Sequence, residues 1–266
     1  MAGLATMSAS RRTALISLVI FGTLVVPATG WAKQAVVDYA LWDEVLARYV
    51  SDGRVNYAGL MTSRASLEAA LYDMAEAVPE DFQSREEQLA FWINAYNAYV
   101  LKGVLGHYPV PSVKRIAGFF DRIRYRIGGR ELTLNEIESA GRALGDWRLH
   151  MALACASSSC PPLRAEAYVP ERLERQLADQ TRRFLNDPKR GLRLEGTTLL
   201  LSQIFKWYAQ DFVPGARRFT STQLLAVLAP YVEEGLAGAI ERGQPAIGFL
   251  DYDWSLNESS PARRSE

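Results

Sequence analysis

The segment from Arg85 to Gly106 constrains the fold of this chain more than any other, because it is apolar on almost every side of a helix. It reads REEQLAFWINAYNAYVLKGVLG. Such a helix is stable only when other elements cover most of its circumference. Ser84 and Glu87 predict a capping box at its start, and the prolines of the following YPVPSV stop it after Gly106 and His107. We therefore predict a buried central helix.

Two amide side chains stand out within this apolar helix. Asn94 and Asn97 are three residues apart, so they share one face. A buried amide without partners costs about 1–3 kcal/mol. The simpler interpretation is that both bind the backbone of a neighbouring loop. The alternative is that they line a site, where they orient a substrate or a catalytic imidazole.

The N-terminus carries the features of a secretory signal peptide. Arg11 and Arg12 precede an apolar run from Thr13 to Val26, and small residues lead to Ala32. A membrane anchor needs roughly 20 apolar residues, more than this run supplies before Pro27. We predict cleavage of residues 1–32 after Ala32, a periplasmic or secreted protein, and no stable membrane span afterwards. An uncleaved N-terminal anchor is the alternative.

The charge argues against nucleic acid as a partner. The formal net charge is zero, and it becomes −2 without residues 1–32, whose only charged side chains are Arg11 and Arg12. No basic block remains that could bind by releasing counter-ions from phosphates. Ten phenylalanines, twelve tyrosines and six tryptophans supply material for a large core. The sequence leaves the partners unknown.

Helical segments and hairpins interleave along the rest of the chain. Amphipathic patterns predict helices over 38–50, 63–77 and 171–185, and caps at Thr133, Ser202 and Thr220 start further helices. Turns at Gly128-Gly129 and Glu195-Gly196 predict hairpins, while residues 247–257 form an aromatic strap. This order predicts an α+β fold: a single domain over 33–257, mostly helical around a small, largely antiparallel sheet. Residues 258–266 are predicted to be a disordered tail.

Both cysteines of the chain lie in RLHMALACASSSCPPL, residues 148–163. An even number of cysteines in an exported protein favours a disulfide between Cys155 and Cys160. That bridge would stabilise the fold by about 2 kcal/mol in the chain-entropy model. A structural disulfide is therefore the leading interpretation of this segment.

The same segment also offers the groups of a thiol enzyme. If RLHMALACAS is a buried strand, His150 and Cys155 point to opposite faces, because residues of equal parity share a face. Cys160, beyond a polar loop, could still meet His150. The hypothesis is then a Cys160 nucleophile, a His150 base and an orienting amide from Asn94 or Asn97. The second histidine of the chain, His107, could reach a cysteine only by long-range folding.

The remaining interpretations of the cysteines carry less support. Zinc could recruit both cysteines and both histidines, but the histidines lack a paired spacing. A redox dithiol is more typically C-x-x-C beside a βαβ unit, which is missing. Buried inert thiols are also possible. We therefore predict no metal and no cofactor. Glu138 and Asp146 are expected to form structural ion pairs with Arg142 or Arg148.

Six blocks occur in an order that resembles the family named domain of unknown function 547 (DUF547). They are QLAFWINAYNAYVLKGVL, HYPVPSVKRI, IGGRELTLNEIE, RLHMALACASSSCPPL, LSQIFKWYAQDF and YDWSLN, between about Leu46 and Asn257. The resemblance, to an exported bacterial member, places Asn94, Asn97, His150, Cys155 and Cys160 at motif positions. It implies little about activity.

Two functions follow from the sequence. One is an exported thiol hydrolase or acyltransferase acting on a peptide- or ester-like substrate. The other is a non-catalytic periplasmic binding or scaffold module, in which the cysteines close a loop and the asparagines brace it. Whether a cysteine sulfur and an imidazole meet at an accessible cleft discriminates between them.

Overall fold

Helix α4 (Arg85–Leu105) is the buried centre of one hydrophobic cluster, as its sequence predicted. In the computed structural model, which describes Met1 and residues 37–215 and 219–259, every residue from Leu89 to Leu105 except Lys102 is buried. The Ser84 side chain accepts a hydrogen bond from Glu87 N at the start of the helix. The Glu87 carboxylate accepts from Gln83 N, so only half of the predicted capping box forms.

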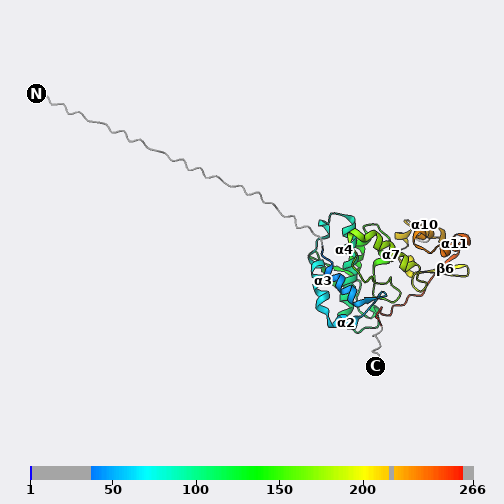
Figure 1. Cartoon of the computed structure of the whole chain (residues 1–266), viewed down its shortest axis with the longest axis horizontal. Coiled ribbons are helices and arrows are strands. Elements are labelled where there is room, and N and C mark those ends of the chain that lie inside the picture. Colours follow the sequence, from blue (N-terminus) through cyan, green and yellow to red (C-terminus); the bar gives the residue numbers. More distant parts are fainter. Residues whose placement is uncertain (2–36, 216–218, 260–266) are drawn as a thin grey trace. The chain divides into compact units, whose positions relative to one another are not determined.

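Helices make up most of the described chain (Figure 1). The α-helices besides α4 are α1 (Ala40–Tyr49), α2 (Tyr57–Thr62), α3 (Arg64–Glu76), α5 (Leu134–Arg142), α6 (Leu149–Ala152), α7 (Leu173–Leu185), α8 (Gln203–Trp207), α9 (Ala209–Phe212), α10 (Ser221–Leu228) and α11 (Glu234–Gly243). Short 3-10 helices span Pro79–Asp81, Val113–Arg115, Pro170–Arg172 and Ala229–Tyr231. Helix α4 packs against α3, α5 and α6.

The strands form three small sheets within the described residues instead of one. Strands β1 (Val50–Ser51) and β2 (Arg54–Val55) make one antiparallel hairpin, and β3 (Arg124–Ile127) and β4 (Arg130–Thr133) make another. The third sheet pairs β5 (Leu192–Glu195) antiparallel to β6 (Thr198–Leu201), and β6 parallel to β7 (Ala246–Phe249). The predicted turns at Gly128-Gly129 and Glu195-Gly196 are therefore confirmed, and the α+β, single-domain fold class holds.

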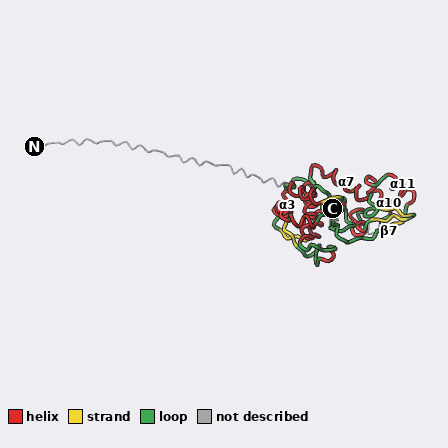
Figure 2. Tube along the Cα trace, turned by 60° about the horizontal axis from the view of Figure 1, so that its bottom comes forward, coloured by secondary structure: helices red, strands yellow, loops and turns green. Residues whose placement is uncertain are grey.

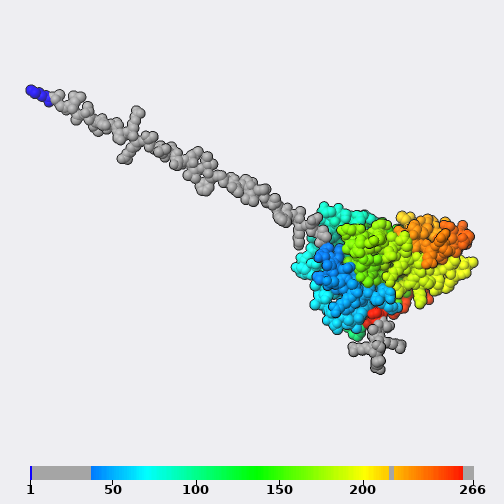
Figure 3. Space-filling model, in the orientation of Figure 1, coloured from blue at the N-terminus to red at the C-terminus, as the bar shows by residue number. Residues whose placement is uncertain are grey.

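Two hydrophobic clusters organise these elements. The first surrounds α4 and includes side chains of α1, α3 and α5. The second lies on the β5–β6–β7 sheet, with α8, α10 and α11 packed against it. Figure 2 shows β7, α10 and α11 together, away from α3. On the surface in Figure 3, the blue-to-green residues cover one part and the yellow-to-orange residues cover the other.

The segment after β7 straps the first cluster, as the sequence predicted. Leu256 N donates to Pro111 O, Asn257 N donates to Ala156 O, and Tyr57 donates its hydroxyl hydrogen to the Asn257 side chain at 2.8 Å. The folded chain extends past the predicted domain end at residue 257. Glu258 forms an isolated β-bridge with Val55, and Ser259 N donates to Val55 O. The rest of the predicted tail (260–266) and the predicted signal peptide (1–32, apart from Met1) lie outside the described residues.

The capping box that starts α5 is complete, so removing it should lower the free energy of unfolding measurably. Thr133 Oγ1 accepts from Glu136 N at 3.2 Å, and the Glu136 carboxylate accepts from Thr133 N at 2.7 Å. Replacing Thr133 with alanine is expected to lower the free energy of unfolding by about 1 kcal/mol, because it leaves a helix N–H without its partner. Urea denaturation measures this. Ser139→Ala, an exposed position on the same helix, should change it by less than about 0.5 kcal/mol.

Candidate functional site

The segment that carries the site begins as a helix, so the predicted strand over 148–157 is wrong. Leu149–Ala152 is α6, and extended backbone starts at Leu153. The helical turn is set by Asp146, whose carboxylate accepts from Arg148 N at 3.0 Å while its carbonyl accepts from Leu149 N. The parity argument that separated His150 from Cys155 therefore does not apply.

Asn97 anchors this segment to α4. Its Nδ2 donates to Ala152 O at 3.0 Å, and its Oδ1 accepts from Ala154 N at 2.8 Å. Asn94 plays the equivalent role for another loop, because it donates to Tyr168 O and accepts from Tyr168 N. Both amides thus bind loop backbone. Among the described residues neither is hydrogen-bonded to an imidazole, so the structure does not bring them to His150 as orienting groups.

A strained turn brings the two cysteine sulfurs together. Ala156, which follows Cys155, has φ of 63°, a left-handed conformation that is uncommon for a residue with a Cβ. Cys155 N donates to Cys160 Sγ at 2.8 Å, and Cys160 N donates to Ser157 O. The two sulfurs are 2.6 Å apart, yet both cysteines are free thiols. The predicted structural disulfide is not formed in this structure.

The two thiols differ in exposure and in acidity. Cys160 is 4% exposed, and burial raises the pKa of its thiol well above the ordinary value. Cys155 is half-buried. The hydrogen bond from Cys160 is the largest of the causes that lower the pKa of Cys155 to about 7, and the Ser157 and Tyr252 hydroxyls add to it. Those hydroxyl oxygens lie 3.2 and 3.3 Å from Cys155 Sγ.

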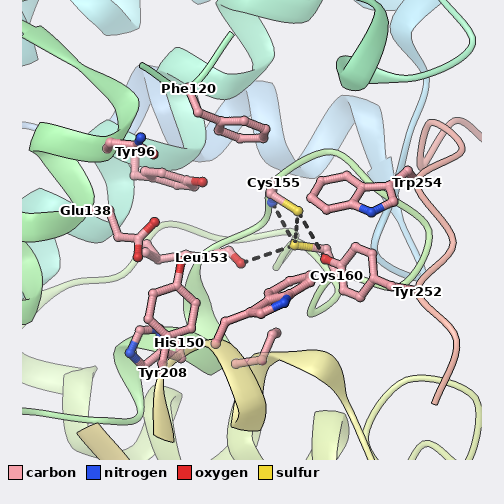
Figure 4. Close-up of a pocket in the computed structure, with 13 residues that line it drawn as sticks. Tyr96, Phe120, Glu138, His150, Leu153, Cys155, Cys160, Tyr208, Tyr252 and Trp254 are labelled. Carbon is pink, nitrogen blue, oxygen red and sulfur yellow. Dashed lines mark hydrogen bonds between the residues drawn. The ribbon is translucent and has the colours of Figure 1, made fainter. Parts of the chain in front are cut away.

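Cys155 opens into a cavity of about 310 Å³ between the two hydrophobic clusters. Figure 4 shows Glu138 and Tyr208 on the side opposite Cys155 and Trp254. Burial, followed by the neighbouring Glu138 carboxylate, raises the pKa of Tyr208, so this hydroxyl keeps its proton. The lining residues are Tyr96, Phe120, Asn135, Glu138, His150, Leu153, Cys155, Cys160, Ile204, Trp207, Tyr208, Tyr252 and Trp254.

His150 lines the same cavity and is fixed by a carboxylate. Its Nε2 lies 2.7 Å from Asp211 Oδ2, and Arg142 binds both oxygens of Asp211. The hydrogen bond with His150, followed by that with Arg142, lowers the pKa of Asp211 far below its usual range. An ionised carboxylate only accepts, so His150 Nε2 carries a hydrogen and donates it to Asp211.

The imidazole does not bond a sulfur among the described residues. The Tyr208 ring covers His150 at a centroid distance of 4.1 Å. His107 lies elsewhere, with Nδ1 3.0 Å from Gly103 O. The described residues also hold no group of three or more histidine, cysteine or acidic side chains placed to bind a metal ion. The structure thus joins His150, Cys155 and Cys160 at one cavity and leaves His107 out.

Sequence reasoning missed two partners in this site. Asp211 comes from α9, which is separated from α8 at Tyr208. Tyr252 comes from the strap after β7. The signals were present: an acidic residue in the aromatic block FKWYAQDF, and a tyrosine in FLDYDW. Of the predicted ion pairs, Arg148–Asp146 forms, whereas Arg142 binds Asp211 instead of Glu138.

A scan against protein-family models matches residues 79–185 to the family described as "Protein of unknown function, DUF547". This segment is similar to DUF547 over less than half of the chain. The DUF547 match contains Asn94, Asn97, His150 and both cysteines, but it ends before Asp211 and Tyr252. No match was found among curated proteins or among solved structures. In residues 37–215 and 219–259, no helix has the length and apolar character needed to cross a membrane.

Proposed function

We propose that the cavity is the active site of a thiol hydrolase or acyltransferase in which Cys155 is the nucleophile. The observation that carries the proposal is the environment of Cys155 Sγ, which faces a cavity and is surrounded by the Cys160 thiol and the hydroxyls of Ser157 and Tyr252. Hydrogen bonds to the charged form favour a thiolate, which is the nucleophilic form of cysteine.

Cys155 suits this role better than Cys160, the nucleophile favoured by the sequence. Both cysteines line the cavity, but Cys160 is almost fully buried and keeps its proton, whereas Cys155 is half-buried. At neutral pH the Cys155 thiolate is populated through the Cys160 thiol and the Tyr252 hydroxyl, whose oxygen accepts from Ser157. An imidazole in contact with the sulfur is then not required to generate it. We assign His150 the role of positioning the Tyr208 ring, because Asp211 holds the imidazole and the ring packs against it.

The reaction follows from this arrangement. The Cys155 thiolate attacks the carbonyl carbon of an ester- or peptide-like substrate, and the leaving alkoxide or amine departs with a proton. The resulting thioester is then attacked by water or by an acceptor, which loses a proton and releases the thiolate. Glu138, opposite Cys155, is placed to receive that proton, and the Tyr208 hydroxyl beside it is placed to donate one.

Trapping the acyl-enzyme tests the proposal. The reduced full chain is incubated with p-nitrophenyl acetate and butyrate, and intact mass is followed over time. We expect one acyl group per chain on Cys155, with a rate that rises with pH through about 7 as the thiol ionises. Tyr252→Phe removes one donor, so the rate at pH 7 should fall several-fold while the midpoint moves to higher pH.

The matched control is Cys155→Ser, which should give no hydroxylamine-sensitive adduct. Thermal unfolding of both variants shows whether the fold is kept. If the folded wild-type protein takes up no acyl group, or takes it up equally after Cys155→Ser, acyl transfer at Cys155 is excluded. The non-catalytic binding module then becomes the better interpretation.

A further inference from the structure

We propose that Cys155 and Cys160 also form a peroxide-reducing dithiol pair, whose substrate is a small organic hydroperoxide bound in the same cavity. This activity goes beyond acyl transfer, because it uses the second thiol as a reactant. The C-x4-C spacing argued against a redox dithiol in the sequence. The structure removes that objection, since the turn at Ala156 places the two sulfurs 2.6 Å apart.

The pair needs no large rearrangement to form a bond. Backbone contacts hold both sulfurs in place, because Cys155 N donates to Cys160 Sγ and Cys160 N donates to Ser157 O. In many dithiol systems the second thiol must reach the first through local unfolding, whereas here the two are already in contact. The chain contains no other cysteine, so Cys160 is the only internal thiol that can react with an oxidised Cys155.

The two thiols are also ordered in accessibility. Both cysteines line the cavity, but Cys155 is half-buried, whereas only 4% of Cys160 is exposed. An oxidant that enters the cavity therefore meets Cys155 first. The same contacts that favour a thiolate at Cys155 leave Cys160 as a protonated thiol. A nucleophilic thiolate backed by a protected thiol is the arrangement of a redox-active pair.

The cavity wall indicates the class of peroxide. Apolar and aromatic side chains, among them Phe120, Leu153, Ile204 and Trp254, face the space in front of Cys155. This lining suits the organic group of a hydroperoxide better than the small polar molecule H₂O₂. Ser157 Oγ donates to the Tyr252 hydroxyl oxygen at 3.0 Å beside the sulfur, so the Tyr252 hydroxyl hydrogen can be donated to the oxygen that leaves.

The chemistry balances in three steps. The Cys155 thiolate attacks the terminal oxygen of ROOH, the O–O bond breaks, and the alkoxide takes a proton to become ROH, leaving Cys155 as the sulfenic acid. The Cys160 thiol attacks that sulfur, a disulfide forms and water leaves. An external dithiol then reduces the disulfide by exchange and is itself oxidised to its disulfide.

The test uses the reduced full chain, cumene hydroperoxide as the probe and dithiothreitol as the reductant. We expect a mass lower by two hydrogen atoms after one equivalent, and turnover when reductant is present. The first step should be on the order of 100-fold faster than the reaction of free cysteine, because the Tyr252 hydroxyl assists the leaving oxygen. Cumene hydroperoxide should react faster than H₂O₂.

Two variants separate the steps. Cys160→Ser, nearly isosteric, should stop at the sulfenic acid, seen as one added oxygen that dimedone captures. Cys155→Ser should show neither product, and thermal unfolding confirms that each variant is folded. A wild-type protein that oxidises without forming the disulfide would overturn the proposal. So would a first step no faster than that of free cysteine, or a faster reaction with H₂O₂.

The outcome is distinguishable from that of acyl transfer. Acyl-enzyme formation needs Cys155 but not the Cys160 sulfur, so Cys160→Ser should still form the acyl adduct, more slowly, while it loses the disulfide. If peroxide produces the disulfide and esters leave no adduct, acyl transfer fails and the dithiol proposal stands. If esters acylate Cys155 and peroxide never joins the two sulfurs, the reverse holds.

Discussion

Replacing Asn97 with leucine is expected to lower the free energy of unfolding by about 3–5 kcal/mol. Leucine has a similar volume but offers no hydrogen bond, so Ala152 O and Ala154 N–H both lose their partner in the interior. A buried backbone group left unsatisfied costs about 1–3 kcal/mol, and here there are two. Urea denaturation of the wild type and of the variant measures the difference.

Asn97→Leu should also disturb the turn that holds the two cysteine sulfurs. Ala154 directly precedes Cys155, so a released loop loses the turn that holds the two sulfurs together. Under native conditions we expect faster alkylation of Cys160, which is buried in the wild type. Asn135→Leu is the matched control, because Asn135 is exposed, and it should cost less than about 0.5 kcal/mol. A loss below about 1 kcal/mol for Asn97→Leu would contradict the anchoring role.

Features set by contacts between near neighbours were predictable from the sequence. The capping boxes at Thr133 and Thr220 form as expected, because both partners lie within one helical turn. The turns at Gly128-Gly129 and Glu195-Gly196 form as expected because their glycines adopt positive φ. The buried central helix was predictable too, since a segment with no polar face has only one stable location.

The cysteine segment was not predictable in the same way. A short apolar run is compatible with a strand or with one buried helical turn, and periodicity does not separate them. The deciding contacts are the Asp146 carboxylate on Arg148 N and the Asn97 side chain on Ala152 and Ala154. Asn97 lies more than fifty residues earlier in the chain, so its contact is visible only after folding.

The same limit explains which parts of the site were found. His150 and the cysteines are close in sequence, so the search for chemistry located them together. The groups that determine their state come from distant elements: Asp211 from α9 and Tyr252 from the strap. These partners lower the pKa of Cys155 and hold His150, so the sequence located the cysteine segment but not the contacts that distinguish its two thiols.

Arg148→Met is also expected to lower the free energy of unfolding by several kcal/mol. Arg148 donates to both oxygens of the nearly buried Asp146, at 3.0 and 2.8 Å, and the methionine would leave that carboxylate without its main partner. Removing one member of a buried ion pair costs about 3–5 kcal/mol. The exposed Glu174 partner adds little to this figure. Since Asp146 starts α6, the loss should also disturb the cavity that contains His150.

The pH dependence identifies the cause of this effect. Burial acts to raise the pKa of Asp146, but the hydrogen bonds and charge of Arg148 outweigh it and lower the pKa below its usual value. The wild type therefore holds this stabilisation above about pH 4, the unfolded-state value, and loses it as the pH falls further. In Arg148→Met the buried carboxylate has no cation beside it, so protonation at low pH removes an uncompensated charge. Acid therefore reduces the destabilisation that the substitution causes. The stability difference should shrink below about pH 4.

A double variant shows whether Arg148→Met destabilises the fold by leaving the Asp146 charge uncompensated or by removing side-chain packing. Asp146→Asn combined with Arg148→Met removes both charges but keeps the side-chain oxygen that accepts from residue 148 N. We expect it to cost about 1–2 kcal/mol, less than Arg148→Met alone, because no ion remains uncompensated. A double variant as unstable as the single one, with a difference from wild type that does not change with pH, would mean that Arg148 acts through its packing.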